Sequence, residues 1–180
     1  MRFGGIVLAA ALLLGACSSD PAPKEPTGTP STSSSAPARA VPTMPAQASE
    51  DSSEGAAAFV KHYVDVFNYA AATGDVDELS RLSSPACEGC QSYIKLYKET
   101  YEAGGYFKGG DWKIGDLKVR AGTDETYLTT TITAESSRYR EDDGSPEKRD
   151  PGERSTLSFA IARPTGSWMT SQLGLGEVVP

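Results

Sequence analysis

The segment TYLTTTITAES, residues 126–136, decides the fold class, because its side chains alternate along its whole length. One face of an extended strand carries Leu128, Thr130, Ile132 and Ala134, and the other carries Tyr127, Thr129, Thr131 and Thr133. A strand with this pattern buries one face and exposes the other, which is typical of antiparallel sheets.

Three neighbouring segments extend this sheet. Ser155–Ala162 alternates in the same way, and Ser167–Leu173 follows as the last strand. In Trp112–Val119 the apolar positions change phase, which predicts a β-bulge near Gly115. We therefore expect one curved, four-stranded antiparallel sheet.

The segment Arg138–Glu153, between two of these strands, is almost wholly charged and contains Gly144 and two prolines. This composition predicts a long hairpin loop. The alternative is a dedicated docking loop for a protein partner.

Helical periodicity precedes the strands. Apolar residues recur at three- and four-residue spacing over Glu54–Thr73, and Gly74 suits the helix end. A short helix over Val76–Leu82 and a third between residues 85 and 104 follow. Helices followed by antiparallel strands make an α+β fold. A curved sheet closing around such helices resembles the cone of the nuclear-transport-factor-2-like (NTF2-like), or cystatin-like, superfamily.

The first sixteen residues have the features of a signal peptide. The apolar run Ile6–Leu14 has nine residues, whereas a helix needs about 20 to span a bilayer. The following Leu14-Gly15-Ala16-Cys17 resembles the lipobox of bacterial lipoproteins. This resemblance implies cleavage before Cys17 and acylation of its thiol, for example with palmitate. An ordinary cleaved signal with a chance cysteine is the alternative.

Two acyl chains hold a protein stably on a membrane. We therefore expect an extracytoplasmic protein, lipid-anchored to the cell membrane through Cys17. Residues 17–53 are rich in Pro, Ser, Thr and Ala, which predicts a disordered tether, followed by a single domain over residues 54–180.

The net charge of the chain is −7, and loss of Arg2 with the signal peptide would make it −8. An acidic chain of this kind has no electrostatic basis for binding nucleic acid.

The most specific motif of the domain is Cys87-Glu88-Gly89-Cys90. With Cys17 acylated, these two cysteines form an even pair in an oxidising compartment, which favours a structural disulfide. A redox-active dithiol at a helix N-terminus is the alternative. A zinc site would need further ligands that the sequence does not supply nearby, so we expect no metal and no cofactor.

Several segments also resemble a family of actinobacterial lipoproteins defined by a domain of unknown function. They are Tyr69–Asp75 (YAAATGD), Leu82–Cys90 (LSSPACEGC) and Tyr101–Gly105 (YEAGG) followed by Trp112. The resemblance implies the cone-shaped fold and an envelope location, and it implies no activity.

Aromatic residues indicate a ligand pocket. Tyr93, Tyr97 and Tyr101 form a stripe on the third helix, and with Trp112 they could line the interior of the cone or fill it as core. His62, the only histidine, could act as a general base or pack on a helix flank.

No catalytic residues can be assigned from these patterns. We therefore expect a non-catalytic binding or interaction module whose partner is an envelope protein or a small apolar ligand. The alternative is a small-ligand carrier or enzyme that uses the cone interior, and a third hypothesis is thiol–disulfide exchange at Cys87 and Cys90.

Overall fold

The computed structural model describes residues 39–176. Its helices are η1 (Ala46–Ser49), α1 (Ser53–Thr73), α2 (Asp77–Arg81) and α3 (Glu88–Glu102). Its strands are β1 (Gly104–Gly109), β2 (Trp112–Ile114), β3 (Lys118–Ala121), β4 (Thr126–Ala134), β5 (Ser137–Asp142), β6 (Lys148–Asp150), β7 (Arg154–Ala162) and β8 (Met169–Leu175). In this part of the chain, no helix is both long and apolar enough to cross a membrane.

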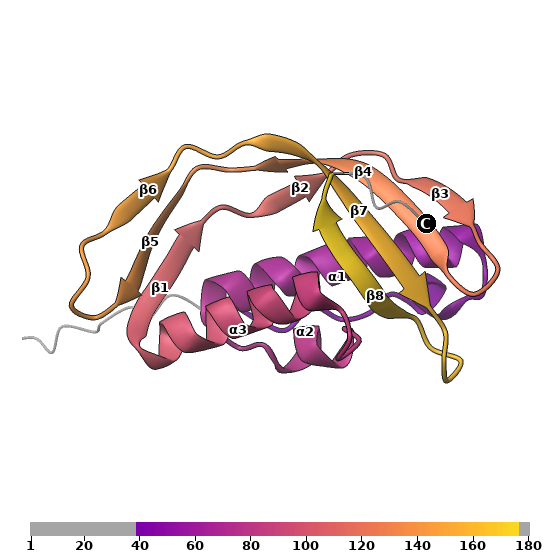
Figure 1. The fold of residues 1–180 in the computed structure, drawn as a ribbon, viewed down its shortest axis with the longest axis horizontal. Coiled ribbons are helices and arrows are strands. Elements are labelled where there is room, and N and C mark those ends of the chain that lie inside the picture. Colours follow the sequence, from indigo (N-terminus) through magenta and orange to yellow (C-terminus); the bar gives the residue numbers. More distant parts are fainter. Residues whose placement is uncertain (1–38, 177–180) are drawn as a thin grey trace, which may run out of the picture. The chain divides into compact units, whose positions relative to one another are not determined.

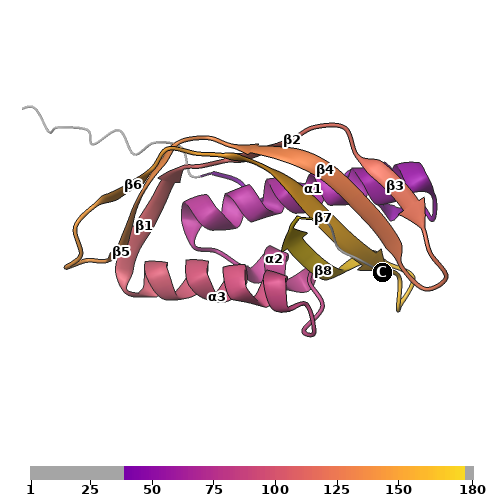
Figure 2. The same ribbon diagram turned by 45° about the horizontal axis from the view of Figure 1, so that its top comes forward.

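The strands form two antiparallel sheets that arch over the helices, as Figure 1 and Figure 2 show. The larger sheet has the order β2-β4-β7-β8, and β3 also pairs with β4. The smaller sheet has the order β1-β5-β6. Because β5 follows β4 directly, the chain passes from the larger sheet into the smaller one at residues 135–136.

The ends of α1 follow from its capping residues. The backbone N–H of Gly55 donates to Oγ of Ser52 (2.9 Å), which satisfies a donor of the first turn. At the other end Gly74 adopts a left-handed conformation with φ of 76°, which ends the helix. The expected boundaries of the first helix are confirmed.

The core lies between the larger sheet and α1. Leu128 and Ile132 of β4 are buried, as the alternation predicts. Leu128 pairs across the sheet with Phe159, whose ring meets that of Tyr63 of α1 edge-on at a centroid distance of 5.8 Å. Each fully buried side chain of this size contributes about 1.5–3 kcal/mol.

The α+β prediction is confirmed, but the prediction of a single four-stranded sheet is wrong. The expected strand Trp112–Val119 is divided into β2 and β3, which pair with different parts of β4. The break falls near Gly115, where the phase change placed it. The larger sheet therefore has five strands.

The smaller sheet was missed because its strands depend on distant partners. β1 begins and ends with glycines, which in a sequence are typical of turns. It is nevertheless a strand, Gly104–Gly109, which pairs with β5, Ser137–Asp142. A Cβ on Gly105 would lie 2.3 Å from the carbonyl oxygen of Arg140, so glycine permits this close approach. The charged segment Arg138–Glu153 is accordingly a hairpin that carries β5 and β6, and not a loop throughout.

The domain also begins earlier than residue 54. Residues 39–53, assigned above to the tether, pack against the domain: Ala48 is only 1% exposed, and Nε1 of Trp168 donates to the carbonyl oxygen of Glu50 (3.0 Å). Arg39 forms an ion pair with Asp111 (2.8 Å). The predicted signal peptide, Cys17 and the first part of the tether lie outside the described residues.

Candidate functional site

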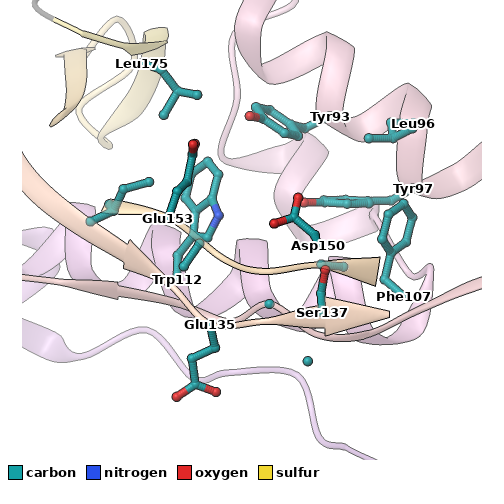
Figure 3. Close-up of a pocket in the computed structure, with 15 residues that line it drawn as sticks. Tyr93, Leu96, Tyr97, Phe107, Trp112, Glu135, Ser137, Asp150, Glu153 and Leu175 are labelled. Atoms are coloured by element: carbon teal, nitrogen blue, oxygen red, sulfur yellow. The ribbon is translucent and has the colours of Figure 1, made fainter. Parts of the chain in front are cut away.

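A pocket of about 230 Å³ opens between α3 and the region where the two sheets meet. Figure 3 shows its aromatic side chains converging on this space. The lining residues are Ala71, Tyr93, Leu96, Tyr97, Phe107, Gly109, Gly110, Trp112, Ile132, Ala134, Glu135, Ser137, Asp150, Glu153 and Leu175.

Aromatic rings form the walls of this pocket. The indole of Trp112 stacks on the buried Phe67 at a centroid distance of 4.1 Å and meets Tyr93 edge-on at 5.6 Å. Tyr97 meets Phe107 edge-on at 5.4 Å. Each such contact contributes about 0.5–1.5 kcal/mol beyond burial, so the wall is held in a defined geometry.

The Tyr97 side chain is only 6% exposed, and its hydroxyl points into the pocket, toward the space that Asp150 also faces in Figure 3. No hydrogen bond joins this hydroxyl to another of residues 39–176, and it is not among their fully buried unpartnered atoms, so it is open to solvent in the pocket. Burial raises the pKa of Tyr97, so the group is protonated at neutral pH. Burial and then the carboxylate of Glu153 also raise the pKa of Tyr93.

Three carboxylates lie at the rim, and the lining contains no lysine, arginine or histidine. Glu135 points away from the rings in Figure 3 and forms an ion pair with Lys113. Asp150 and Glu153 have no ion-pair partner in the described part of the chain. Asp150 accepts a hydrogen bond from the backbone N–H of Gly152 (2.8 Å), which leaves its second oxygen open.

Of the four residues predicted to line a pocket, three do so: Tyr93, Tyr97 and Trp112. Tyr101 is absent from the lining. Its hydroxyl donates to the carbonyl oxygen of Ala71 (2.9 Å) and accepts from the N–H of Phe107 (3.3 Å). Tyr101 therefore fastens the end of α1 to β1.

Sequence reasoning missed Phe107, Asp150 and Glu153. These residues come from β1 and from the hairpin that carries β6, the parts of the fold that were not expected. The sequence showed that this hairpin is rich in acidic residues. Without knowledge of the β1–β5 pairing, it did not show that any of them would lie near the tyrosines of α3.

His62 lies elsewhere. It is 2% exposed on α1, and its Nε2 has no hydrogen-bond partner among the described residues. Burial lowers its pKa, while the nearby carboxylates of Glu78 and Asp65 oppose this shift. Glu78 belongs to α2, and His62 is absent from the lining of the pocket.

Cys87 and Cys90 are bonded to each other, as predicted, with an S–S distance of 2.03 Å, and both are 1% exposed. The backbone N–H of Cys90 donates to Sγ of Cys87 (3.2 Å) at the start of α3. A Cβ on Gly89 would lie 2.0 Å from the carbonyl oxygen of Leu173, so this turn of α3 rests directly on β8. Among residues 39–176, no group of His, Cys, Asp and Glu is arranged to hold a metal ion.

The arrangement of helices beneath curved antiparallel sheets is similar to that of several solved structures, among them proteins described as NTF2-like or as having a cystatin-like fold. The intermembrane-space region of the chloroplast protein ARC6 has a TM-score of 0.51 and 11% identity, over 72% of this chain and 99% of that one. An NTF2-like family protein from Streptomyces avermitilis has a TM-score of 0.40 and 17% identity, over 67% and 95%. A Caulobacter vibrioides protein with a cystatin-like fold has a TM-score of 0.44 and 11% identity, over 67% and 88%.

Sequence identities this low show similarity of fold and nothing about function. None of the curated proteins compared with the chain matches it. Residues 26–173 match the family of unknown function DUF6318, and the chain belongs to that family. The predicted membership of a family of unknown function is thereby confirmed, whereas the actinobacterial and lipoprotein attributes stay predictions.

Proposed function

We propose that this chain is a lipid-anchored protein of the cell envelope whose domain is a non-catalytic binding module, with the aromatic pocket as its binding site. The observation that carries the binding role is the Tyr97 hydroxyl, which belongs to a side chain 6% exposed and faces the pocket. A hydroxyl held at the wall of a pocket by a largely buried ring can orient a ligand by a hydrogen bond.

His62, the side chain best suited to general acid–base catalysis near neutral pH, is absent from the pocket. General acid–base chemistry needs a proton-transferring group within hydrogen-bond reach of the substrate. The groups of that kind that do line the pocket are its tyrosines and the carboxylates at its rim. An enzyme that uses the cone interior is the alternative, and its proton transfer would depend on Asp150 or Glu153.

The burial of the disulfide argues against thiol–disulfide exchange. A catalytic dithiol presents one sulfur to its substrate. Cys87 and Cys90 are each 1% exposed, and they lie at the start of α3, where Gly89 closely approaches β8. We assign them the role of fixing the start of α3.

The anchor rests on the sequence LGAC at residues 14–17, and it is tested by substitution. Cys17→Ser should abolish palmitate labelling and release the chain from the membrane fraction, whereas Ser18→Ala, beside it, should change neither. Labelled, membrane-bound Cys17→Ser protein would refute the anchor.

The binding role is tested by native mass spectrometry of the full chain, solubilised in non-ionic detergent. A reproducible mass increment that disappears on denaturation, and that Trp112→Leu reduces, is expected. A bare chain would contradict occupancy of the pocket and would favour a protein partner at the charged β5–β6 hairpin.

A further inference from the structure

The walls of the pocket are rings whose faces carry negative partial charge. Tyr93, Tyr97, Phe107 and Trp112 come from three separate elements and meet around one space of about 230 Å³. Aromatic faces arranged around a small space attract cations by about 0.5–2 kcal/mol per contact. A group of rings in a closed core would not leave such an opening.

The rim adds full negative charge to this space. Asp150 and Glu153 line the pocket without an ion-pair partner in the described part of the chain, and no basic side chain lines it. Glu153 lines the same pocket as the rings of Tyr93 and Trp112. The charge and the rings are independent features, and both favour a positively charged ligand over a neutral or anionic one.

The size and the mouth of the pocket limit the ligand further. Its volume lies below the roughly 300–1,000 Å³ typical of sites for drug-sized molecules. Leu96 and Leu175, which are 46% and 53% exposed, lie at its edge. Exposed leucines at a pocket mouth are suited to contact an apolar substituent.

We propose that this pocket binds a small organic cation, namely an amine or quaternary ammonium group that carries a short apolar substituent. The assignment rests on the proposed function, because it names the ligand class of the same pocket. The positive group lies among Tyr93, Tyr97 and Trp112 with Asp150 and Glu153 nearby, and the apolar part lies toward the leucines.

The test is isothermal titration calorimetry on the full chain in non-ionic detergent with choline, butylamine and 3,3-dimethylbutanol, the uncharged isostere of choline. Saturable binding of at least one cation, roughly tenfold or more tighter than the isostere, is expected. Added phosphatidylcholine vesicles that compete with choline would identify a lipid headgroup as the source of the ammonium. A lack of competition would identify a free amine.

Single substitutions measure separately how much the carboxylates and the aromatic rings contribute to cation binding. Asp150→Asn and Glu153→Gln change exposed side chains, and each should weaken cation binding about two- to fivefold. Asp143→Asn, an exposed acid of the same hairpin outside the pocket, is the matched control and should have no effect. Trp112→Leu should weaken binding roughly ten- to thirtyfold.

The outcomes distinguish the two proposals. If 3,3-dimethylbutanol binds as tightly as choline, or neither cation binds up to tens of millimolar, the cation assignment is overturned. The binding module itself survives such a result if native spectra still show a bound molecule. It fails only if those spectra show a bare chain.

Discussion

The ring of Tyr101 lies directly over the α-carbon of Gly74: a Cβ built on Gly74 would be 2.4 Å from Cγ of the tyrosine. Gly74 ends α1 with φ of 76°, a conformation that side chains other than glycine rarely adopt. The junction between α1 and α3 therefore depends on glycine for two separate reasons, its backbone conformation and its lack of a side chain.

Gly74→Ala should lower the free energy of unfolding by about 2–4 kcal/mol, the sum of left-handed strain and the displacement of Tyr101. Gly166→Ala is the control, because Gly166 has φ of 86° but a Cβ added to it would meet nothing within 4 Å. It should cost only about 1–2 kcal/mol. Urea denaturation measures both variants, and equal losses would show that the Tyr101 contact is unimportant.

Removing the hydroxyl of Tyr101 should destabilise the domain, whereas removing the hydroxyl of Tyr97 should leave its stability nearly unchanged. Tyr101→Phe leaves the carbonyl of Ala71 and the N–H of Phe107 without their partner, which should cost about 1–2 kcal/mol. Tyr97→Phe removes a hydroxyl that faces the pocket, and stability should change by less than about 0.5 kcal/mol. Urea denaturation of the two variants decides the matter, and a large loss for Tyr97→Phe would mean that its hydroxyl is structural.

The elements that were predicted correctly are those whose own residue pattern shows which face is buried. Spacing within α1 and alternation within β4 report burial on one face of a single element, so both were located correctly. β1 and β5 are held by pairing with each other, and their own residues, glycine-flanked or charged, give no such pattern. Strand pairing at this sequence distance is a tertiary effect that propensity does not contain.

Among the residues of the candidate site, the sequence indicated only the tyrosines of α3 and Trp112. Helical spacing brought Tyr93 and Tyr97 onto one face, and the change of period identified Trp112 as the start of a strand. The same spacing also included Tyr101, although one further turn carries it past the pocket to the end of α1. Asp150 could not be placed, because its position follows from the hairpin.

His62 should make the domain acid-sensitive. Burial lowers its pKa from the ordinary value of 6.5, so the unfolded chain binds this proton more readily than the folded one. The free energy of unfolding is therefore highest above about pH 6.5. It decreases as the pH falls from there through the lowered pKa of His62, by at most about 1.4 kcal/mol per pH unit.

The experiment compares urea denaturation of the parent chain and of His62→Phe between pH 7.5 and 5.5. The variant replaces the imidazole by an apolar ring and should flatten the dependence in this range. Carboxylates such as Glu78 titrate mainly at lower pH, since the hydrogen bond from Arg81 lowers its pKa. An unchanged slope in His62→Phe would assign the acid sensitivity to other groups.

The disulfide should resist reduction for as long as the start of α3 stays on β8. Attack on a disulfide requires access to a sulfur, and Cys87 and Cys90 are 1% exposed. Reduction by dithiothreitol should therefore be slow in the folded chain and accelerate with urea, because local opening must come first. Gly89→Ala, which places a Cβ against the carbonyl oxygen of Leu173, should speed reduction under native conditions. Replacing both cysteines with serine should cost roughly 2 kcal/mol, the low end for so short a loop. A folded chain that is reduced as fast as the unfolded one would restore thiol–disulfide exchange as a candidate function.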